Sequence, residues 1–386
     1  MKKKILVWET LATVSGGQKM TLTVMDLLRD TYDFCCLIPA EGRMSEELDR
    51  RGIPYVILGD QSLPTGVKGK SVIFRYAAMS IRCIWRSLSA IRKYKPDMLY
   101  APGPAALPWS AICGTLCRKP VIWHIHHVFL DGMTGKLLNI CAKWKCVRKM
   151  IGVSAACTDQ IKDPVAHEKT AVLYNPIKVD WYRAGDASRV IDELSEKLGR
   201  RLDLDNTDVV GHIALIQRPK KQDLTMRVIG NLKRQGRNVV GIFCGEVRDS
   251  EFYEELLALA REQGIADDVL FLGWRNDVPD IIKCMDLNVC PSTFEGFSLV
   301  AQEAAAAGVP SIVANVAGVG EFMRLSGSGM LFEADNVDEA TSNAASVINN
   351  KEEYGKCGME YSENWRFERY NENIHREFAD VEKFLK

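Results

Sequence analysis

Residues 294–310 read FEGFSLVAQEAAAAGVP, and this stretch says more about the fold than any other part of the chain. The apolar run 286–290 comes directly before it and predicts a strand that ends at Pro291. The segment from about Phe297 to Gly308 is rich in alanine and predicts a helix. A strand, a turn and a helix in this order are typical of a parallel α/β sheet.

The two glutamates of this stretch indicate what the turn could bind. A helix start carries free backbone N–H groups and partial positive charge, so it can hold an anion such as a diphosphate. Glu295 comes just before this helix, and Glu303 lies eight positions later, about two helical turns on. Carboxylates on either side of a bound diphosphate can accept hydrogen bonds from a sugar and from a ribose. The alternative is an ordinary strand–turn–helix unit with two solvated glutamates.

The same stretch resembles the signature of glycosyltransferase family 4, whose members are retaining nucleotide-sugar transferases with two glutamates separated by seven residues. Other stretches resemble the family in the family's order over nearly the whole chain: SGGQKMTL from Ser15, VIWHIHH from Val121, IGVSAACTDQI from Ile151, VLYNPIKVDWY from Val172, RPKKQ from Arg218 and VLFLGWRNDVPDIIKCMDLNVCPS from Val269. The resemblance implies the GT-B fold, in which two doubly wound Rossmann-like domains face each other across a cleft and a C-terminal helix crosses back to the first domain. It also implies transfer without a metal ion or any other cofactor.

Strand-like runs alternate with helix-length segments along the whole sequence, which predicts an α/β protein with parallel sheets. The alternation pauses in the charged stretch 183–208 and then restarts, so we expect two sheets. We place an acceptor-side domain at residues 1–178 with a returning helix at 365–386, and a nucleotide-sugar-binding domain at 179–364. The expected strands are Ile5–Trp8, Phe34–Ile38, Tyr55–Leu58, Met98–Ala101, Val121–Ile125, Met150–Val153, Ala171–Leu173, Val209–Leu215, Val239–Cys244, Val269–Leu272, Leu287–Cys290, Ser311–Val313 and Met330–Phe332.

Length and composition fit a large enzyme of a reducing compartment. The chain has 386 residues, 47% of them hydrophobic, and no apolar run is long enough to span a bilayer. Glu9 interrupts the start of the chain, which therefore reads as a first strand and not as a signal peptide. Twelve cysteines without a signal peptide indicate the cytoplasm. Cys113, Cys117 and the three histidines that follow them fit no standard zinc spacing.

The net charge is zero, but the two halves of the chain differ in charge. Residues 1–180 contain 26 Lys/Arg against 15 Asp/Glu, whereas residues 181–386 contain 24 against 35. This asymmetry suggests that the first half faces an anionic partner. A nucleic-acid partner is disfavoured, because the pI is near 7 and no recognition motif is present.

Residues 68–95 hold eight basic and no acidic residues, and a second basic patch follows at 135–149. A helix over the first patch places four cations on one stripe beside an apolar face that includes Trp85; they are Arg75, Arg82, Arg86 and Lys93. Such a helix can lie on an anionic membrane, here the inner face of the plasma membrane. The alternative is an ordinary core helix with a solvated basic face.

The family resemblance assigns further residues to the donor in the second domain. Lys220 falls where the family has a phosphate-binding lysine, and a fixed cation there would stabilise the departing diphosphate. Leu215 stands where the family usually has an arginine, so we expect Arg218 to supply the second cation. The backbone amides expected to bind the diphosphate are those of Gly296, Phe297, Ser298 and Leu299.

Two candidates lie in the first domain. Gly16 and Gly17 follow the first strand and precede a helix expected near Met20, so they could form a ligand loop or a plain turn. There is no G-x-G-x-x-G, so the dinucleotide-binding fingerprint is absent. His126 aligns best with the family histidine near the donor sugar, with His124 and His127 as competitors.

We therefore predict a retaining glycosyltransferase that moves a sugar from a UDP- or GDP-sugar to a saccharide or lipid-linked acceptor, in the synthesis of bacterial cell-surface polysaccharide or lipopolysaccharide. Glu295 would hold the donor sugar and Glu303 the ribose. The stretch Asp203-Leu204-Asp205 resembles the metal motif of the other major transferase fold, but its place in a charged linker indicates a solvated loop. Two alternatives remain: a sugar-nucleotide 2-epimerase, which the glutamate pair disfavours, and a catalytically silent partner subunit, which the missing arginine favours.

Overall fold

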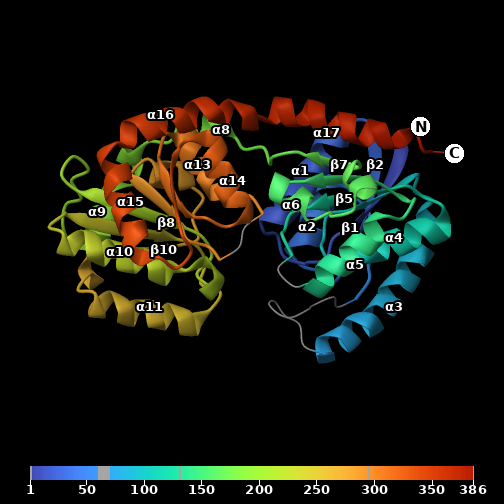
Figure 1. Ribbon diagram of the computed structural model, residues 1–386, viewed down its shortest axis with the longest axis horizontal. Helices are drawn as coiled ribbons and strands as arrows, with labels where there is room; N and C mark the ends of the chain where they lie inside the picture. Colours follow the sequence, from blue (N-terminus) through green and yellow to red (C-terminus); the bar gives the residue numbers. More distant parts are fainter. Residues whose placement is uncertain (1, 60–69, 130–131, 294–295, 386) are drawn as a thin grey trace. The chain divides into compact units, whose positions relative to one another are not determined.

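The computed structural model describes residues 2–59, 70–129, 132–293 and 296–385, which form two compact units (Figure 1). The first unit comprises Met1–Asn175 together with Glu368–Lys386, and the second comprises Pro176–Phe367. The chain therefore passes from the first unit to the second after residue 175 and returns after residue 367.

The first unit is built on a seven-stranded parallel sheet in the order β3-β2-β1-β4-β5-β6-β7. The central strands are buried on both faces and are therefore almost continuously apolar, whereas the strands at the two edges are only half-buried. The strands are β1 (Lys3–Trp8), β2 (Tyr32–Ile38), β3 (Tyr55–Ile57), β4 (Met98–Ala101), β5 (Val121–Ile125), β6 (Val147–Gly152) and β7 (Thr170–Val172). The connecting helices are α1 (Gly16–Leu28), α2 (Arg43–Arg51), α3 (Lys70–Tyr94), α4 (Ala106–Cys117), α5 (Gly132–Ala142), α6 (Ala155–Asp159) and α7 (Pro164–His167).

The second unit has a six-stranded parallel sheet in the order β10-β9-β8-β11-β12-β13. Its strands are β8 (Asp208–Ile213), β9 (Val239–Cys244), β10 (Val269–Gly273), β11 (Leu287–Cys290), β12 (Ser311–Ala314) and β13 (Gly329–Phe332). The helices are α8 (Val179–Arg183), α9 (Ile191–Leu198), α10 (Gln222–Arg234), α11 (Ser250–Glu262), α12 (Val278–Ile282), α13 (Leu299–Ala307), α14 (Ala317–Ser326), α15 (Val337–Asn349) and α16 (Lys351–Ser362). Both predicted sheets are thus confirmed, and each of the thirteen expected strands overlaps an observed one.

The expected returning helix is α17 (Phe367–Glu382), whose apolar face packs into the core of the first unit. Tyr370, Ile374 and Phe378 are buried there, and the Tyr100 ring lies 5.4 Å from that of Phe378. At the end of the helix, the Tyr32 hydroxyl donates a hydrogen bond of 2.8 Å to Glu382.

Close packing explains the alanine-rich sequence of α13. On the neighbouring helix α16, a Cβ at Gly355 would lie 2.2 Å from the Gly308 carbonyl oxygen, and one at Gly358 would lie 3.0 Å from the Ala305 Cα. Small residues on both helices are therefore needed for the two backbones to approach. α13 ends at Gly308, whose φ of 82° suits glycine.

Two charged stretches contain further structure. The stretch 183–208, where the alternation of strands pauses, contains α9, whose Leu194 is buried. The second basic patch, residues 135–149, runs from α5 through a turn into β6. Its cations have local partners: Lys149 pairs with Glu377, and Lys143 pairs with Asp163 at 2.8 Å.

Within the described part of the chain, no helix has the length and apolar character required to cross a membrane.

Candidate functional site

The topology of the second sheet brings two loops to one place. From β8 the chain runs outward through β9 and β10, and it then crosses back to add β11 on the other side of β8. In open parallel sheets, ligands bind outside the carboxyl ends of the strands at such a switch point. β8 leads there into the turn Arg218–Lys220, and β11 leads into the stretch that precedes α13.

The two loops are joined by a hydrogen bond. The Thr293 N–H donates to the Pro219 carbonyl oxygen at 3.0 Å, and the Lys220 N–H closes the turn by donating to Gln217 at 2.9 Å. Burial, together with the charge of Lys220, lowers the pKa of His212 at the end of β8 to about 3. Lys220 therefore lies beside the carboxyl end of β8 and one hydrogen-bonded contact away from the glutamate motif.

The start of α13 is shaped by Ser298, whose hydroxyl oxygen accepts a hydrogen bond from the Ala301 N–H at 3.3 Å. Phe297 is buried, and its ring meets Phe322 edge-on at 5.7 Å. Its side chain thus belongs to the core, so only its backbone can serve a ligand. Glu295, the expected sugar-binding residue, lies outside the described residues.

Glu303 lies half-buried on α13 and has a partner that the sequence did not reveal. The Tyr182 hydroxyl, on α8, donates a hydrogen bond to its carboxylate. Burial and the adjacent Glu303 charge raise the pKa of Tyr182, so its hydroxyl stays protonated and remains a donor. Tyr182 ends the stretch VLYNPIKVDWY that resembles the family, but this resemblance does not indicate the pairing, because Glu303 lies 121 positions away in the sequence.

Arg218 is engaged by acidic side chains of α11. Its guanidinium donates to both Glu255 carboxylate oxygens, at 2.8 and 2.6 Å, and lies 3.5 Å from Asp249. These carboxylates raise its pKa and compensate its charge. The role of Arg218 as the second diphosphate cation stays a prediction, and this pairing argues against it. Lys221, next in the turn to Lys220, pairs with Asp335 at 2.7 Å.

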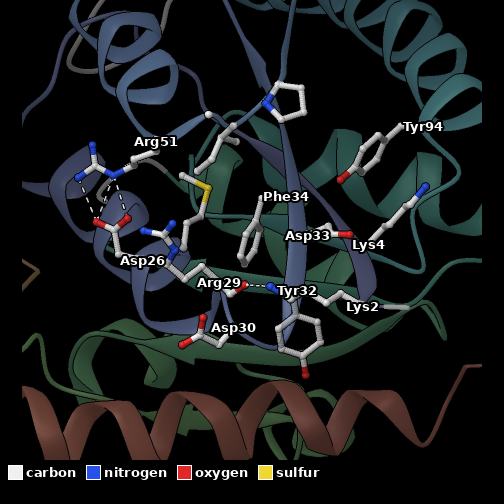
Figure 2. A pocket seen from close by; sticks show the side chains of 14 residues that line it. Lys2, Lys4, Asp26, Arg29, Asp30, Tyr32, Asp33, Phe34, Arg51 and Tyr94 are labelled. Atoms are coloured by element: carbon white, nitrogen blue, oxygen red, sulfur yellow. Dashed lines mark hydrogen bonds and ion pairs between the residues drawn. The ribbon is translucent and has the colours of Figure 1, made fainter.

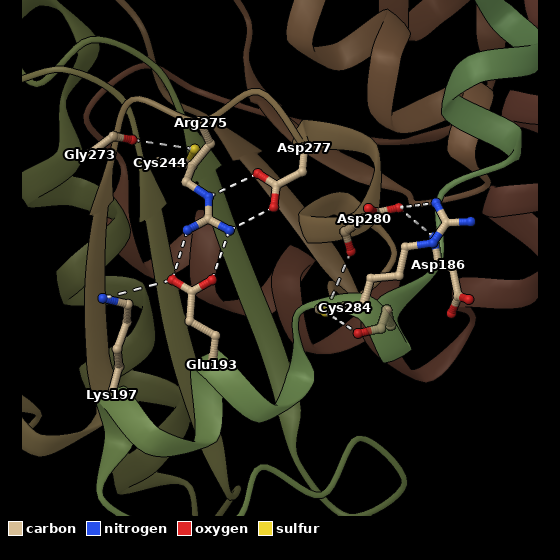
Figure 3. A network of polar contacts seen from close by, with 11 residues as sticks. Asp186, Glu193, Lys197, Cys244, Gly273, Arg275, Asp277, Asp280 and Cys284 are labelled. Atoms are coloured by element: carbon tan, nitrogen blue, oxygen red, sulfur yellow. Dashed lines mark hydrogen bonds and ion pairs between the residues drawn. The ribbon is translucent and has the colours of Figure 1, made fainter.

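A polar network fixes the loop that follows β10 at the same edge of the sheet (Figure 3). Arg275 contacts Glu193 of α9 at 2.7 and 2.9 Å and also contacts Asp277. Lys197 adds a longer contact of 3.8 Å to Glu193. Trp274, directly before Arg275, is 63% exposed and is thus presented on a rigid loop.

In the first unit, His126 follows β5 and is buried, and its ring centre lies 4.2 Å from that of His124. Burial, followed by the neighbouring histidines, lowers the pKa of His126 well below its usual range. His126 is therefore neutral near pH 7 and can offer a hydrogen bond but not a charge. Its competitor His124 is held by the Tyr100 hydroxyl, 2.6 Å from His124 Nδ1.

Gly16 and Gly17 lie in the first turn of α1, because this helix begins at Gly16 and not near Met20 as expected. A Cβ at Gly17 would meet no atom within 4 Å, so packing inside the unit does not require this glycine. An approaching ligand remains a reason for it. Glu9, which was not among the predicted site residues, is buried beside this turn and accepts hydrogen bonds from Gln18 at 2.8 Å and Thr21 at 2.9 Å.

A cavity of about 420 Å³ lies at the opposite end of the first sheet, by the amino-terminal ends of β1 and β2 (Figure 2). Its rim mixes cations with carboxylates, and Arg51 pairs there with Asp26 at 2.9 Å. None of the predicted site residues that the structure describes lines it. The cavity is therefore not part of the candidate site.

The stripe of α3 is only partly available to an outside partner. Arg86 donates to the Leu58 carbonyl at 2.8 Å, and a Cβ at Gly59 would lie 3.5 Å from the Arg82 guanidinium. Lys93 is exposed, and the Arg75 side chain lies outside the description. Beside these cations, Ile81 and Trp85 are 74% and 71% exposed. The apolar face of α3 is thus partly uncovered.

Asp203 stabilises the turn in which it lies, since its carboxylate accepts hydrogen bonds from the Asp205 N–H at 3.1 Å and from Asn206 at 2.8 Å. Among the residues with described positions, no three His, Cys, Asp or Glu side chains are grouped to hold a metal ion.

Comparisons with known proteins cover both units. Residues 195–364 match the family described as glycosyl transferases group 1, and residues 42–181 match the family described as glycosyltransferase family 4. The chain is 23% identical to the UDP-Gal:alpha-D-GlcNAc-diphosphoundecaprenol alpha-1,3-galactosyltransferase of Escherichia coli, over 91% of this chain and 89% of that protein. It is 33% identical to the lipopolysaccharide core biosynthesis mannosyltransferase LpsB of Rhizobium meliloti over a shorter region, 26% of this chain and 29% of that protein. The structure matches Anabaena Alr3699/HepE in complex with UDP and glucose with a TM-score of 0.77 at 20% identity, over 98% and 99% of the two chains.

Proposed function

Because this chain belongs to the group 1 glycosyltransferases of family 4, with the GT-B fold, we propose that it transfers a hexose from a UDP-sugar to a saccharide or lipid-linked acceptor. UDP is bound by the Anabaena protein of the same fold, and UDP-Gal and a diphosphoundecaprenol acceptor are named for the Escherichia coli relative. These names support a place in the synthesis of bacterial cell-surface polysaccharide or lipopolysaccharide.

The observation that carries this proposal is the hydrogen bond between Thr293 and Pro219, because it joins the Lys220 turn to the glutamate motif at the switch point. We assign the diphosphate to Lys220 and to the backbone amides of residues 296–299. Glu303 holds the ribose, and Glu295 holds hydroxyls of the donor sugar.

Chemically, the leaving group gains negative charge as the anomeric bond breaks. In this proposal the Lys220 ammonium and the amide dipoles of α13 stabilise that charge, which is the work that a metal ion does in other transferases. The acceptor hydroxyl attacks the anomeric carbon from the face that the diphosphate leaves, so the configuration is retained. The leaving diphosphate takes up the proton of that hydroxyl. Family resemblance assigns His126 a place near the donor sugar, and its neutral ring suits a hydrogen bond there.

We further propose that α3 attaches the protein to an anionic membrane surface at which a lipid-linked acceptor resides. Exposed Ile81 and Trp85 can enter the headgroup layer, while Arg75, Arg82, Arg86 and Lys93 supply attraction.

A catalytically silent partner subunit is the second candidate. It is favoured by Leu215, which replaces the usual arginine, and by the carboxylates that compensate Arg218.

The decisive assay incubates the protein with UDP- and GDP-sugars, with and without bacterial lipid extract, and measures release of the nucleoside diphosphate. We expect release from a UDP-sugar, stimulated by the extract and unchanged by EDTA. An epimerised sugar, free or still attached to the nucleotide, formed without acceptor would indicate the epimerase. Neither release nor epimerisation under any condition would indicate the silent subunit, and loss of activity in EDTA that magnesium or manganese restores would overturn metal independence.

A further inference from the structure

Tyr182 lies on α8, the short helix that follows the entry of the chain into the second unit. Its side chain is only 7% exposed, and α8 packs against α13. The Tyr182 hydroxyl donates its hydrogen bond to Glu303, the residue of α13 that the proposed function assigns to the ribose. The hydroxyl is thus buried against the one carboxylate of α13 that is proposed to touch the nucleotide.

α8 and the residues just before it also form hydrogen bonds with residues 359–366. The Ile177 N–H donates to the Trp365 carbonyl at 2.9 Å, and Arg183 donates to the Met359 carbonyl at 2.7 Å. Asp180 accepts two hydrogen bonds from Arg366, at 2.7 and 2.9 Å. These contacts connect α8 to the segment that leads back to the first unit, so the backbone that carries Tyr182 is held in place.

A carboxylate that binds a ribose needs a defined orientation. It has two oxygens that can accept hydrogen bonds, and an isolated glutamate on a helix samples several rotamers. A donor fixed on one side of the carboxylate reduces that freedom and leaves lone pairs for the ribose hydroxyls, so less entropy is lost on binding. The acceptor-only character of an ionised carboxylate makes it a suitable partner for both donors.

We propose that Tyr182 is a positioning residue for the nucleotide: its hydroxyl orients Glu303 to accept hydrogen bonds from the ribose. This inference rests on the proposed donor site, and it predicts that Tyr182 acts on nucleotide binding only through Glu303.

The test is a double-mutant cycle on UDP affinity, measured by calorimetry for the wild type, Tyr182→Phe, Glu303→Ala and the double variant. We expect Tyr182→Phe to weaken UDP binding about three- to tenfold, less than the loss of a direct charged contact, because Glu303 keeps its carboxylate and loses only its orientation. Glu303→Ala should weaken it further, and adding Tyr182→Phe to Glu303→Ala should change nothing more. Affinity for inorganic diphosphate should be the same in the wild type and in Tyr182→Phe. The matched control is Tyr253→Phe on α11, which should bind UDP like the wild type.

The outcomes separate this inference from the proposed function. If Tyr182→Phe binds UDP like the wild type, or loses the same factor in the Glu303→Ala background, positioning through Glu303 is wrong. If Tyr182 only supported the fold, Tyr182→Phe would lose the same factor in both backgrounds and would also bind inorganic diphosphate more weakly. If Glu303→Ala itself binds UDP normally, the assignment of Glu303 to the ribose fails first.

Discussion

Burial shifts the pKa values of two side chains in the first unit in opposite directions. Burial raises the pKa of Glu9 to about 7, although Gln18 and Thr21 donate hydrogen bonds to its carboxylate. Burial lowers the pKa of His124 to about 3. Glu9 is therefore partly protonated near neutral pH, and the folded unit favours its protonated form, whereas His124 is neutral.

These shifts predict a pH dependence of stability that one substitution can isolate. Because the folded-state pKa of Glu9 is raised, its stabilising effect is complete below pH 4.5 and is lost as the pH rises through about 7. Between pH 5 and pH 8, the free energy of unfolding of the wild type should fall by about 2–3 kcal/mol relative to Glu9→Gln. Urea denaturation at both pH values measures this difference. Glu41→Gln, exposed in the same unit, is the control and should follow the wild type at both pH values. A difference between Glu9→Gln and the wild type that does not change with pH would contradict the shift.

At the same scale, the sequence predicted where the motif residues lie in the fold but not their partners, and their roles stay predictions. Lys220 and Glu303 could be placed because each lies in a local pattern at a strand end or a helix start. Tyr182 and the acidic partners of Arg218 could not, since these contacts join segments distant in sequence and depend on how helices pack.

At the scale of elements, the alternating apolar runs predicted the strands because parallel strands buried on both faces must be apolar. Boundaries were less certain: the expected start of α1 near Met20 missed the first turn, where two glycines weaken the helix signal. The helix α9 was missed because its short sequence is mostly charged and buries only one side chain.

The close contact of α13 with α16 can be tested by adding a single methyl group. Gly355→Ala places a Cβ 2.2 Å from the Gly308 carbonyl oxygen, so the helices must separate. We expect a loss of about 1–3 kcal/mol in stability, despite the better helix propensity of alanine. Gly135→Ala is the matched control, since its Cβ would meet no atom within 4 Å, and it should be neutral or stabilising. Thermal unfolding compares the two, and equal stability of both variants would mean that α13 and α16 are not tightly packed.

The helix α3 gives a second prediction at this scale. Changing Arg75, Arg82, Arg86 and Lys93 together to glutamine should abolish sedimentation with anionic liposomes, because each cation contributes about 1 kcal/mol at such a surface. Raising the salt concentration should weaken the wild-type association, since exposed charges are screened over about 8–10 Å.

Because Arg86 also holds the Leu58 carbonyl, an independent variant is needed for α3. Ile81→Ser with Trp85→Ser removes two exposed apolar side chains and should likewise reduce sedimentation without loss of folding. Binding by the wild type that is independent of salt, or no binding at all, would show that α3 is only a solvated face.

At the scale of the whole molecule, chain topology decides where function can reside. Each unit has one switch point, between β1 and β4 in the first and between β8 and β11 in the second. Gly16 and Gly17 follow β1, while the Lys220 turn and the glutamate motif follow β8 and β11. Predicted site residues that are scattered through the sequence thus occur where parallel sheets bind ligands.

The central claim is that this second switch point binds a nucleoside diphosphate, and calorimetry with UDP tests it most directly. Relative to the wild type, Glu303→Ala and Lys220→Ala should each lose about 1.5–3 kcal/mol of binding free energy, or roughly 10- to 150-fold in affinity. Lys221→Ala, which removes the neighbouring lysine that is paired with Asp335, should bind UDP as the wild type does. Unchanged UDP affinity in both Glu303→Ala and Lys220→Ala, with the wild type binding normally, would contradict the assignment of the site.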